Sequence, residues 1–170
     1  RNETPSVIFF DELEALAGKR EHTRNSAQSN TVSQFLTELD GFAQNNEGVL
    51  ILGSTNVPWA LDSAFLRPGR FDRMFFVPPP DKVARKSILE HHMQDRPNAG
   101  DIQFDAIANK TSGYSGADLA NLVEMAADEA IDSTIASGEE TAISMQHLVA
   151  ALADSRSSTT EWLTTARNYA

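Results

Sequence analysis

The 170-residue sequence contains no cysteine, so disulfide bonds and thiol chemistry are excluded and a reducing compartment is allowed. No apolar run approaches the roughly 18–20 residues that a membrane-spanning helix needs. No segment has the charged and then apolar pattern of a signal peptide. The four histidines lack the spacing of zinc ligands, so we expect no structural metal. What is left is a globular protein with one core, or one core and a small satellite.

Positive charge is scarce, because 14 Lys and Arg residues stand against 24 Asp and Glu residues and give a net charge of −10. The imbalance is larger in residues 81–170, which hold 14 acidic and seven basic residues. Phosphate contacts need clustered cations, so nucleic acid is disfavoured as the main partner. A well-solvated acidic surface is the ordinary interpretation of this composition.

The first half of the sequence alternates between strand and helix patterns. Residues 6–10 form a short, apolar, β-rich run typical of a buried strand, and residues 48–56 contain a second one. The polar residues 18–30 predict a loop, and apolar residues at helical spacing then predict a helix that ends near Gly41. Residues 74–81 predict a third short strand, stopped by three prolines.

The second half is predicted to be entirely helical. Asp81, Ser115 and Ser144 are the expected N-caps of three of its helices. The helix after Ser115 carries an apolar stripe that predicts its buried face, made of Leu119, Leu122, Val123, Ala126, Ala130 and Ile131. We therefore expect an α/β unit with a parallel sheet at residues 1–80, followed by an all-helical subdomain at residues 81–170.

Acidic and amide side chains come directly after the first two predicted strands. Asp11 and Glu12 follow the first strand, and Ser54, Thr55 and Asn56 end the second. Ligands of open parallel sheets bind beyond the carboxyl ends of the strands, so these residues are candidates for one site. Asp11 is suited to support a hydrated Mg²⁺, Glu12 to polarise a water for attack, and Asn56 to orient that water. The alternative is that the two acids simply start a helix, where negative charge interacts favourably with the helix dipole.

Two arginines, Arg67 and Arg70, flank a Pro-Gly turn in the segment LRPGRFDR. Such a turn is able to hold both side chains outward on a fixed loop. Arginine stabilises charge on a phosphoryl group during transfer, either within one subunit or from a neighbouring one. The alternative is a local pairing of Arg73 with Asp72 inside the loop.

Together, these motifs resemble those of the AAA ATPases, in the group that contains katanin, spastin, the vacuolar-sorting ATPases and the proteasomal ATPases. SVIFFDE resembles the Walker B strand, LDGF at 39–42 the helix end that follows it, and ILGSTN sensor 1. STNVPWALDSAFLRPGRFDRMFFVPPPD resembles the second region of homology, and SGYSGADLANLVEMAADEA the lid helix that closes over the adenine. The resemblance covers nearly the whole chain. It implies the C-terminal part of a parallel-sheet P-loop core followed by a helical lid.

The resemblance implies ATP as substrate and Mg²⁺ as cofactor, and it implies a role for each matching residue of the first half. Asp11 is expected to support Mg²⁺, Glu12 to activate the attacking water and Asn56 to sense the γ-phosphate. Arg67 and Arg70 are expected to be arginine fingers that reach the site of a neighbouring subunit.

In the lid, the resemblance implies three nucleotide contacts. His92 matches a histidine near the adenine and ribose, and its alternative is a packed helix residue. Gly116 and Ala117 match the small residues that let the lid helix approach the nucleotide. Both also suit a helix N-terminus after the Ser115 cap, and the two interpretations do not conflict.

The resemblance also implies partners. Such enzymes act as rings, usually hexamers, and use ATP to pull protein substrates through a central pore. Residues 18–30 are expected to form the second pore loop. We expect no direct nucleic-acid contact, no membrane insertion and a cytoplasmic setting.

The sequence departs from the family in three places. Ser29 and Asn30 stand where the family often has two arginines that contribute to subunit and pore contacts, and the usual proline near Ser157 is missing. No G-x-x-x-x-G-K-[ST] loop, which cradles phosphates, occurs in the sequence. We therefore expect this chain to be part of a longer ATPase and, by itself, neither to bind ATP tightly nor to hydrolyse it. The alternative is a non-catalytic AAA-like interaction module. A hydrolase that uses only Asp11 and Glu12 lacks further metal ligands.

Overall fold

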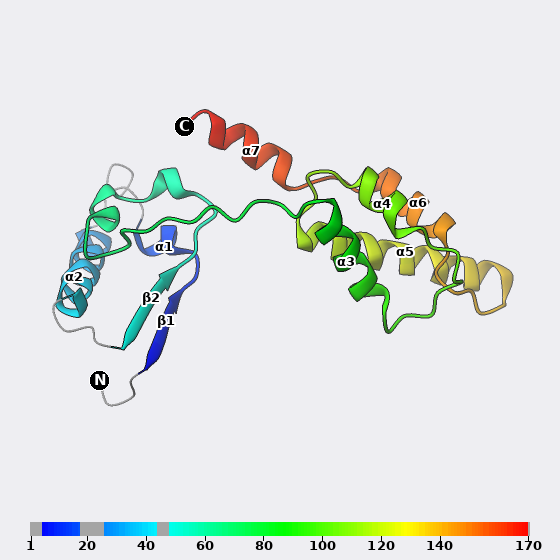
Figure 1. Cartoon of the computed structure of the whole chain (residues 1–170), viewed down its shortest axis with the longest axis horizontal. Coiled ribbons are helices and arrows are strands. Elements are labelled where there is room, and N and C mark those ends of the chain that lie inside the picture. Colours follow the sequence, from blue (N-terminus) through cyan, green and yellow to red (C-terminus); the bar gives the residue numbers. More distant parts are fainter. Residues whose placement is uncertain (1–4, 18–25, 44–47, 170) are drawn as a thin grey trace. The chain divides into compact units, whose positions relative to one another are not determined.

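The computed structural model describes residues 5–17, 26–43 and 48–169, and the chain divides into two compact units (Figure 1). The first unit is Arg1–Phe76 and the second is Val77–Ala170. Each has its own hydrophobic core. The first contains strands and helices and the second contains helices, which confirms the predicted fold class of an α/β core followed by a helical subdomain.

The first unit is built on two parallel strands, β1 (Ser6–Phe10) and β2 (Val49–Gly53). Their register runs from Ser6 opposite Val49 to Phe10 opposite Gly53. Two helices, α1 (Leu13–Ala17) and α2 (Ser26–Ala43), lie between the strands in sequence. Two neighbouring parallel strands need a crossover connection, usually a helix. Here α2 forms it, as the apolar periodicity after residue 30 predicted.

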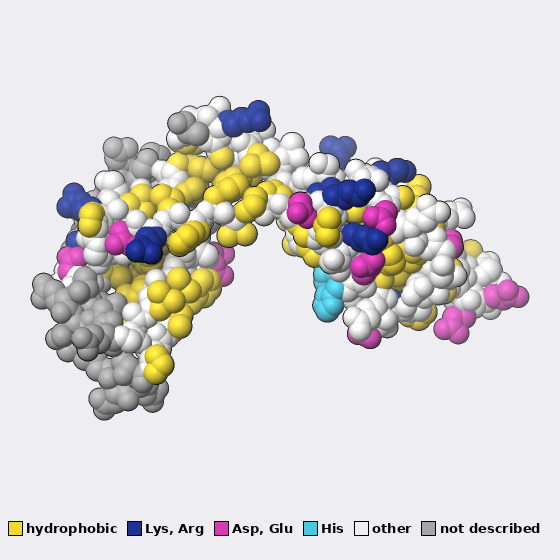
Figure 2. Space-filling view, in the orientation of Figure 1, with side chains coloured by type: hydrophobic (Ala, Val, Ile, Leu, Met, Phe, Trp, Pro, Cys, Tyr) yellow, Lys and Arg dark blue, Asp and Glu magenta, His cyan; other side chains and the backbone are white. Residues whose placement is uncertain are grey.

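One face of this sheet is covered and the other is not. Phe10 and Ile51 pack against a core that Phe35 of α2 also joins, and the Phe10 and Phe35 rings meet edge to face at 4.9 Å. The buried members of this core are Leu13, Val32, Leu36, Leu39, Leu61 and Phe65. The opposite face exposes the alternate residues Val7, Phe9, Leu50 and Leu52, and Figure 2 shows hydrophobic side chains at the surface of this unit.

The expectation that both strands are buried is therefore half right. Side chains alternate between the faces of a strand, so a helix layer on one side buries only every second residue. Parallel sheets are normally covered on both faces. The described residues supply one covering layer, which leaves Val7 and Phe9 62% and 59% exposed.

The predicted third strand at residues 74–81 is wrong, because the described structure assigns no strand there. Its large apolar residues are exposed, Phe75 by 82% and Val77 by 85%. A β-rich run becomes a strand only when a neighbour offers a hydrogen-bonding edge, and three prolines remove further donors. Among the described residues the sheet contains only β1 and β2.

The predicted loop at 18–30 is wrong in part. Ser26–Asn30 belong to α2, and residues 18–25 lie outside the described ranges, as does the predicted pore loop there. Exposed helical turns need no apolar periodicity, so a polar composition alone does not exclude a helix. The connection after β2 holds two short 3₁₀ helices, η2 (Pro58–Ala60) and η3 (Ser63–Leu66), and Asp62 caps the second by accepting the N–H of Ala64.

The second unit contains five helices in its described residues: α3 (Lys82–Met93), α4 (Phe104–Lys110), α5 (Gly116–Ser137), α6 (Met145–Asp154) and α7 (Thr159–Arg167). The predicted N-caps Asp81, Ser115 and Ser144 are confirmed at α3, α5 and α6. Ser115 forms a reciprocal capping box with Asp118. The core joins α3, α4, α5 and α6 through Leu89, Met93, Ile107, Leu119, Leu122, Val123 and Leu148.

One residue of the predicted α5 stripe lies outside this core. Ile131 is 56% exposed, whereas its neighbour Ala130 is buried. Near the end of a long helix the covering elements run out, so a stripe continues in sequence after its partners have ended. Sequence reasoning also missed Arg85, which is buried and whose guanidinium donates to the carbonyls of Pro80 and Ala108.

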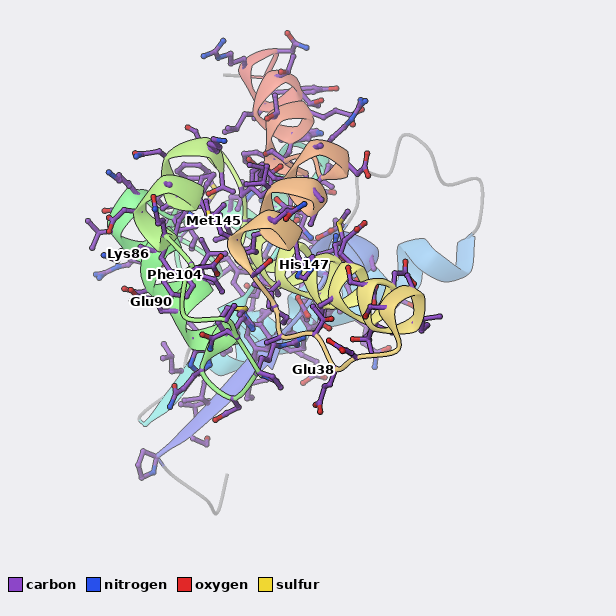
Figure 3. The ribbon with its side chains drawn as sticks, turned by 90° about the vertical axis from the view of Figure 1, so that its right-hand side faces the viewer. Glu38, Lys86, Glu90, Phe104, Met145 and His147 are labelled. Atoms are coloured by element: carbon purple, nitrogen blue, oxygen red, sulfur yellow. The ribbon has the colours of Figure 1, made fainter. Side chains whose placement is uncertain are left out.

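A shallow pocket of about 380 Å³ lies between α3 and the start of α4, beside Lys86, Glu90 and Phe104 (Figure 3). Its charged groups are paired with one another, because Lys86 Nζ contacts Asp105 Oδ2 at 2.5 Å and Glu90 Oε1 at 4.0 Å. The Asp105 hydrogen bond raises the pKa of Lys86, and Lys86 lowers that of Asp105. None of the predicted site residues lines this pocket.

Candidate functional site

The register of the sheet brings the two polar strand ends together. Phe10 is paired with Gly53, so the next residues, Asp11 and Ser54, are neighbours at the carboxyl edge. The Ser54 N–H donates to the Phe10 carbonyl, and the Leu13 N–H donates to the Ser54 carbonyl, each at 2.9 Å. The predicted grouping of polar side chains beyond the strands is thus present for Asp11, Glu12 and Ser54.

Asp11 is exposed and is held by two donors on one oxygen. Its Oδ1 accepts the hydroxyl of Ser54 and the backbone N–H of Glu12, the latter at 2.9 Å. The Ser54 hydrogen bond, followed by that of Glu12, lowers the pKa of Asp11. No described residue donates to Oδ2. Asp11 is therefore an ionised carboxylate with one oriented oxygen and one available oxygen.

Glu12 has an unusual backbone. Its φ is 50°, and in the described part of the chain it is the one non-glycine residue with positive φ. The left-handed region costs a residue with a side chain about 1–2 kcal/mol, and such outliers gather at functional sites. Its N–H is bound to Asp11 and its carbonyl accepts the N–H of Ala15, while its side chain is exposed. The residue type does not predict this positive φ.

Asn56 stands three residues after the end of β2, with an exposed side chain. The preceding Thr55 turns the chain, because its hydroxyl accepts the N–H of Val57 at 3.0 Å. The chain then enters η2 at Pro58.

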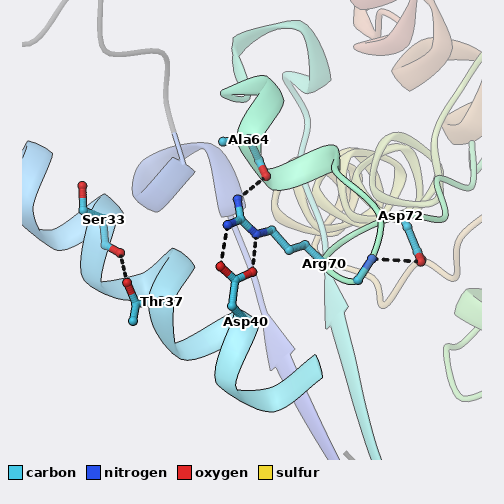
Figure 4. Close-up of polar contacts among 7 residues, drawn as sticks. Ser33, Thr37, Asp40, Ala64, Arg70 and Asp72 are labelled. Atoms are coloured by element: carbon cyan, nitrogen blue, oxygen red, sulfur yellow. Dashed lines mark hydrogen bonds and ion pairs between the residues drawn. The ribbon is translucent and has the colours of Figure 1, made fainter. Parts of the chain in front are cut away.

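The two predicted finger arginines have different surroundings, and Figure 4 shows those of Arg70. Arg70 is bound at both carboxylate oxygens of Asp40, with Nε to Oδ1 and Nη2 to Oδ2 at 2.7 Å each, and its Nη1 donates to the Ala64 carbonyl at 2.6 Å. The Asp40 hydrogen bond raises the pKa of Arg70, and the same bond lowers that of Asp40. The Arg70 side chain is only 14% exposed.

Arg67 lies on the other side of the turn and its side chain forms no hydrogen bond or ion pair with the described residues. It is exposed, and its carbonyl accepts the N–H of Arg70 at 3.1 Å. Gly69 has a φ of 85°, which the turn needs, and its N–H lies 3.5 Å from Asp72 Oδ2. The turn thus presents Arg67 outward and binds Arg70 inward.

The three lid residues belong to the second unit. His92 is half-buried in the last turn of α3, with its ring 5.6 Å from that of His91, and its carbonyl accepts Arg96 Nε at 3.1 Å. Gly116 and Ala117 begin α5 and are exposed. A Cβ at Gly116 would meet no atom within 4 Å, so packing inside this chain does not require glycine there.

Within the described ranges, no group of three or more His, Cys, Asp or Glu residues could hold an ion. Mg²⁺ differs from other cations because it keeps several waters and takes one or two carboxylates plus phosphate oxygens. The available oxygen of ionised Asp11 fits that requirement.

The sequence matches known families over most of its length. Residues 1–79 match the family model "ATPase family associated with various cellular activities (AAA)", and residues 101–150 match "AAA+ lid domain". The "ATP-dependent zinc metalloprotease FTSH 9, chloroplastic/mitochondrial" of Oryza sativa subsp. japonica is 45% identical over 130 residues, which are 76% of this chain and 16% of that protein. The "Mitochondrial inner membrane i-AAA protease supercomplex subunit YME1" of Saccharomyces cerevisiae is 47% identical over 127 residues, 75% of this chain and 17% of that protein. "Protein SAV" of Sulfolobus acidocaldarius is 46% identical over 134 residues, 78% of this chain and 17% of that protein.

The chain spans about a sixth of the length of these relatives. Two of them are named for chloroplasts or mitochondria, so the cytoplasmic setting stays a prediction. Across the described helices, none has the length and hydropathy to cross a membrane. The two family matches, in the order of AAA domain and then lid, show that this chain belongs to the AAA family of ATPases.

Proposed function

We propose that this chain supplies the water-activating half of an ATPase site, in a protein that couples ATP hydrolysis to the remodelling or unfolding of protein substrates. The observation that carries the proposal is the pair of acids at the end of β1, with Asp11 ionised and oriented and Glu12 exposed beside it in a strained conformation. Membership of the AAA family supports ATP as the substrate.

The proposed chemistry divides between the two acids and the amide. Glu12 accepts a proton from the water that attacks the γ-phosphate, and Asn56 orients that water and senses the phosphate. Asp11 would hold the hydrated Mg²⁺. When bound, Mg²⁺ neutralises charge on the phosphate oxygens. The rigid β1 strand behind these residues keeps both carboxylates at the edge of the sheet.

The two arginines are proposed to act on the site of a neighbouring subunit in a ring, which we expect to be a hexamer. Arg67 is ready for this role, because it is exposed and unpaired among the described residues. Arg70 must first exchange Asp40 for phosphate, because its guanidinium is held at three nitrogen atoms. The geometry therefore favours Arg67 as the principal finger and gives Arg70 the additional task of bracing the loop.

The lid is proposed to cover the nucleotide. His92 is expected near the adenine and ribose, and Gly116 and Ala117 are expected to let the start of α5 approach the phosphates and sugar. The surroundings of Gly116 support this role, because a Cβ at this position would meet no atom of another described segment within 4 Å. The ring would act on protein substrates.

The proposed site becomes complete only together with a phosphate loop, which these 170 residues do not contain. We therefore expect the isolated chain neither to bind ATP tightly nor to turn it over. The alternative function is a non-catalytic interaction module, and the exposed apolar face at Val7, Phe9, Leu50 and Leu52 favours it if the native product is no longer than this chain. The intact mass of the gene product from its source cells, compared with 18.6 kDa, separates the two.

The direct test replaces Glu12 by glutamine in the intact protein. The expected result is loss of ATP turnover with retained ATP binding, because the amide keeps the shape of the side chain but accepts no proton. Glu38→Gln is the matched control, since Glu38 is an exposed carboxylate of α2 and turnover should be unchanged. Undiminished turnover in Glu12→Gln would refute the assignment.

A further inference from the structure

Ser54 links the end of β2 to the carboxylate proposed to hold Mg²⁺. Its hydroxyl donates to Asp11 Oδ1, and the Glu12 N–H donates to the same oxygen. We propose that Ser54 is a positioning residue for Asp11, which fixes the orientation of the carboxylate and leaves Oδ2 to a hydrated divalent cation. This inference rests on the proposed function, in which Asp11 supports Mg²⁺.

The backbone gives the Ser54 hydroxyl a fixed place. The Ser54 N–H is bound to the carbonyl of Phe10, directly before Asp11, and the Ser54 carbonyl is bound to the N–H of Leu13, two residues after it. The strand register sets Asp11 and Ser54 side by side in continuation of the pair of Phe10 and Gly53. The backbone of Ser54 is therefore fixed beside Asp11, within reach of the carboxylate that its hydroxyl contacts.

The hydroxyl is important because Asp11 is exposed. Rotation about the terminal torsion of an aspartate is broad, so a solvated carboxylate samples many orientations. Two donors on one oxygen restrict that rotation and assign separate tasks to the two oxygens. Hydrogen-bond partners of metal ligands typically contribute about 10–100-fold to metal affinity or activity.

A purely structural role for Ser54 makes a different prediction. A lost link between strand ends would lower the stability of the chain and weaken nucleotide binding equally with and without metal. A positioning role weakens only the part of nucleotide binding that depends on the metal. Threonine carries the same hydroxyl as serine, and valine has the shape of threonine without it, so the two replacements separate hydrogen bonding from packing.

The experiment uses the intact protein that joins this chain to its phosphate loop, in a Glu12→Gln background that prevents turnover. The affinity of a fluorescent ATP analogue is measured with Mg²⁺ and with EDTA. The ratio of the two affinities is the metal-dependent gain in nucleotide affinity. We expect Ser54→Ala and Ser54→Val to lower the gain by about tenfold or more, and Ser54→Thr to keep it. Thr37→Val is the control, because it removes an exposed hydroxyl of α2 that donates to the Ser33 carbonyl.

The proposal is overturned if Ser54→Val keeps the gain, if Ser54→Thr loses as much as Ser54→Val, or if affinity falls equally with Mg²⁺ and with EDTA. The Thr and Val pair decides the question even if the alanine variant does not fold. Asp11→Ala separates this proposal from the proposed function. If Asp11→Ala loses the metal-dependent gain and Ser54→Val keeps it, only the role of Ser54 is refuted. If Asp11→Ala keeps the full gain, the role of Asp11 itself is refuted.

Discussion

Glycine at position 12 should make the N-terminal unit more stable than alanine at the same position, against the usual order of the two residues. Glu12 has a φ of 50°, where a side chain costs about 1–2 kcal/mol and glycine costs almost nothing. Glycine also has more conformational freedom in the unfolded chain, and this lowers the free energy of unfolding by about 0.4–1 kcal/mol relative to alanine. We expect Glu12→Gly to be more stable than Glu12→Ala by about 1 kcal/mol, which is about 4–8 °C in Tm for a unit of the size of Arg1–Phe76. Neither replacement removes the backbone N–H that binds Asp11.

The assay is urea unfolding followed by tryptophan fluorescence, with linear extrapolation. The chain has two tryptophans, of which Trp59 lies in the first unit and Trp162 in α7. A Trp162→Phe background therefore makes the signal report on the first unit. Position 15 is the control, because Ala15 is exposed in α1 and its replacement by glycine should cost about 1 kcal/mol. The reasoning is refuted if Glu12→Gly is no more stable than Glu12→Ala.

Three further predictions concern contacts away from the two acids. Asp40→Asn should lower Tm at pH 7. Because the hydrogen bond with Arg70 lowers the pKa of Asp40, the difference in Tm from wild type should be full above the ordinary carboxyl pKa and vanish as pH falls through the lowered pKa of Asp40. A constant difference in melts taken from pH 7 to pH 2 would contradict this. Arg85→Ala should destabilise the helical unit by about 2 kcal/mol in urea melts, because it removes the buried guanidinium that donates to the carbonyls of Pro80 and Ala108, and a neutral result would contradict the importance of this network. Asp118→Ala should lower the free energy of unfolding by about 1 kcal/mol, because Asp118 belongs to the capping box of α5. It should also speed hydrogen exchange at the start of α7, because Asp118 accepts the N–H and the hydroxyl of Ser158, and unchanged exchange there would contradict that link.

Local signals in the sequence predicted much of the fold. The apolar run at residues 6–10 became β1, and the caps at Asp81, Ser115 and Ser144 were found where short polar side chains precede apolar periodicity. The failures depend on neighbours. Residues 74–81 have a strand composition, but strand formation needs an adjacent edge that no local pattern reveals.

The candidate site was predicted as a set of residues, but not as a geometry. Asp11 and Glu12 were identified from their position after a strand, whereas the positive φ of Glu12 has no signature in residue type. The pair of Asp40 and Arg70 joins residues 30 apart in sequence, so only the fold brings them together. Ser54 was noted as polar, and its contact with Asp11 follows from a register that the sequence does not specify.

The central claim is that Glu12 acts within its own subunit and Arg67 acts on the next one. The most direct measurement mixes intact Glu12→Gln protein with intact Arg67→Ala protein and records ATP turnover against each variant alone. Each variant alone should be inactive. In equal mixed rings, about a quarter of the sites combine an intact Glu12 with an intact neighbouring Arg67, so we expect turnover near a quarter of wild type. A mixture no more active than its parents, although mixed rings form, would contradict the account.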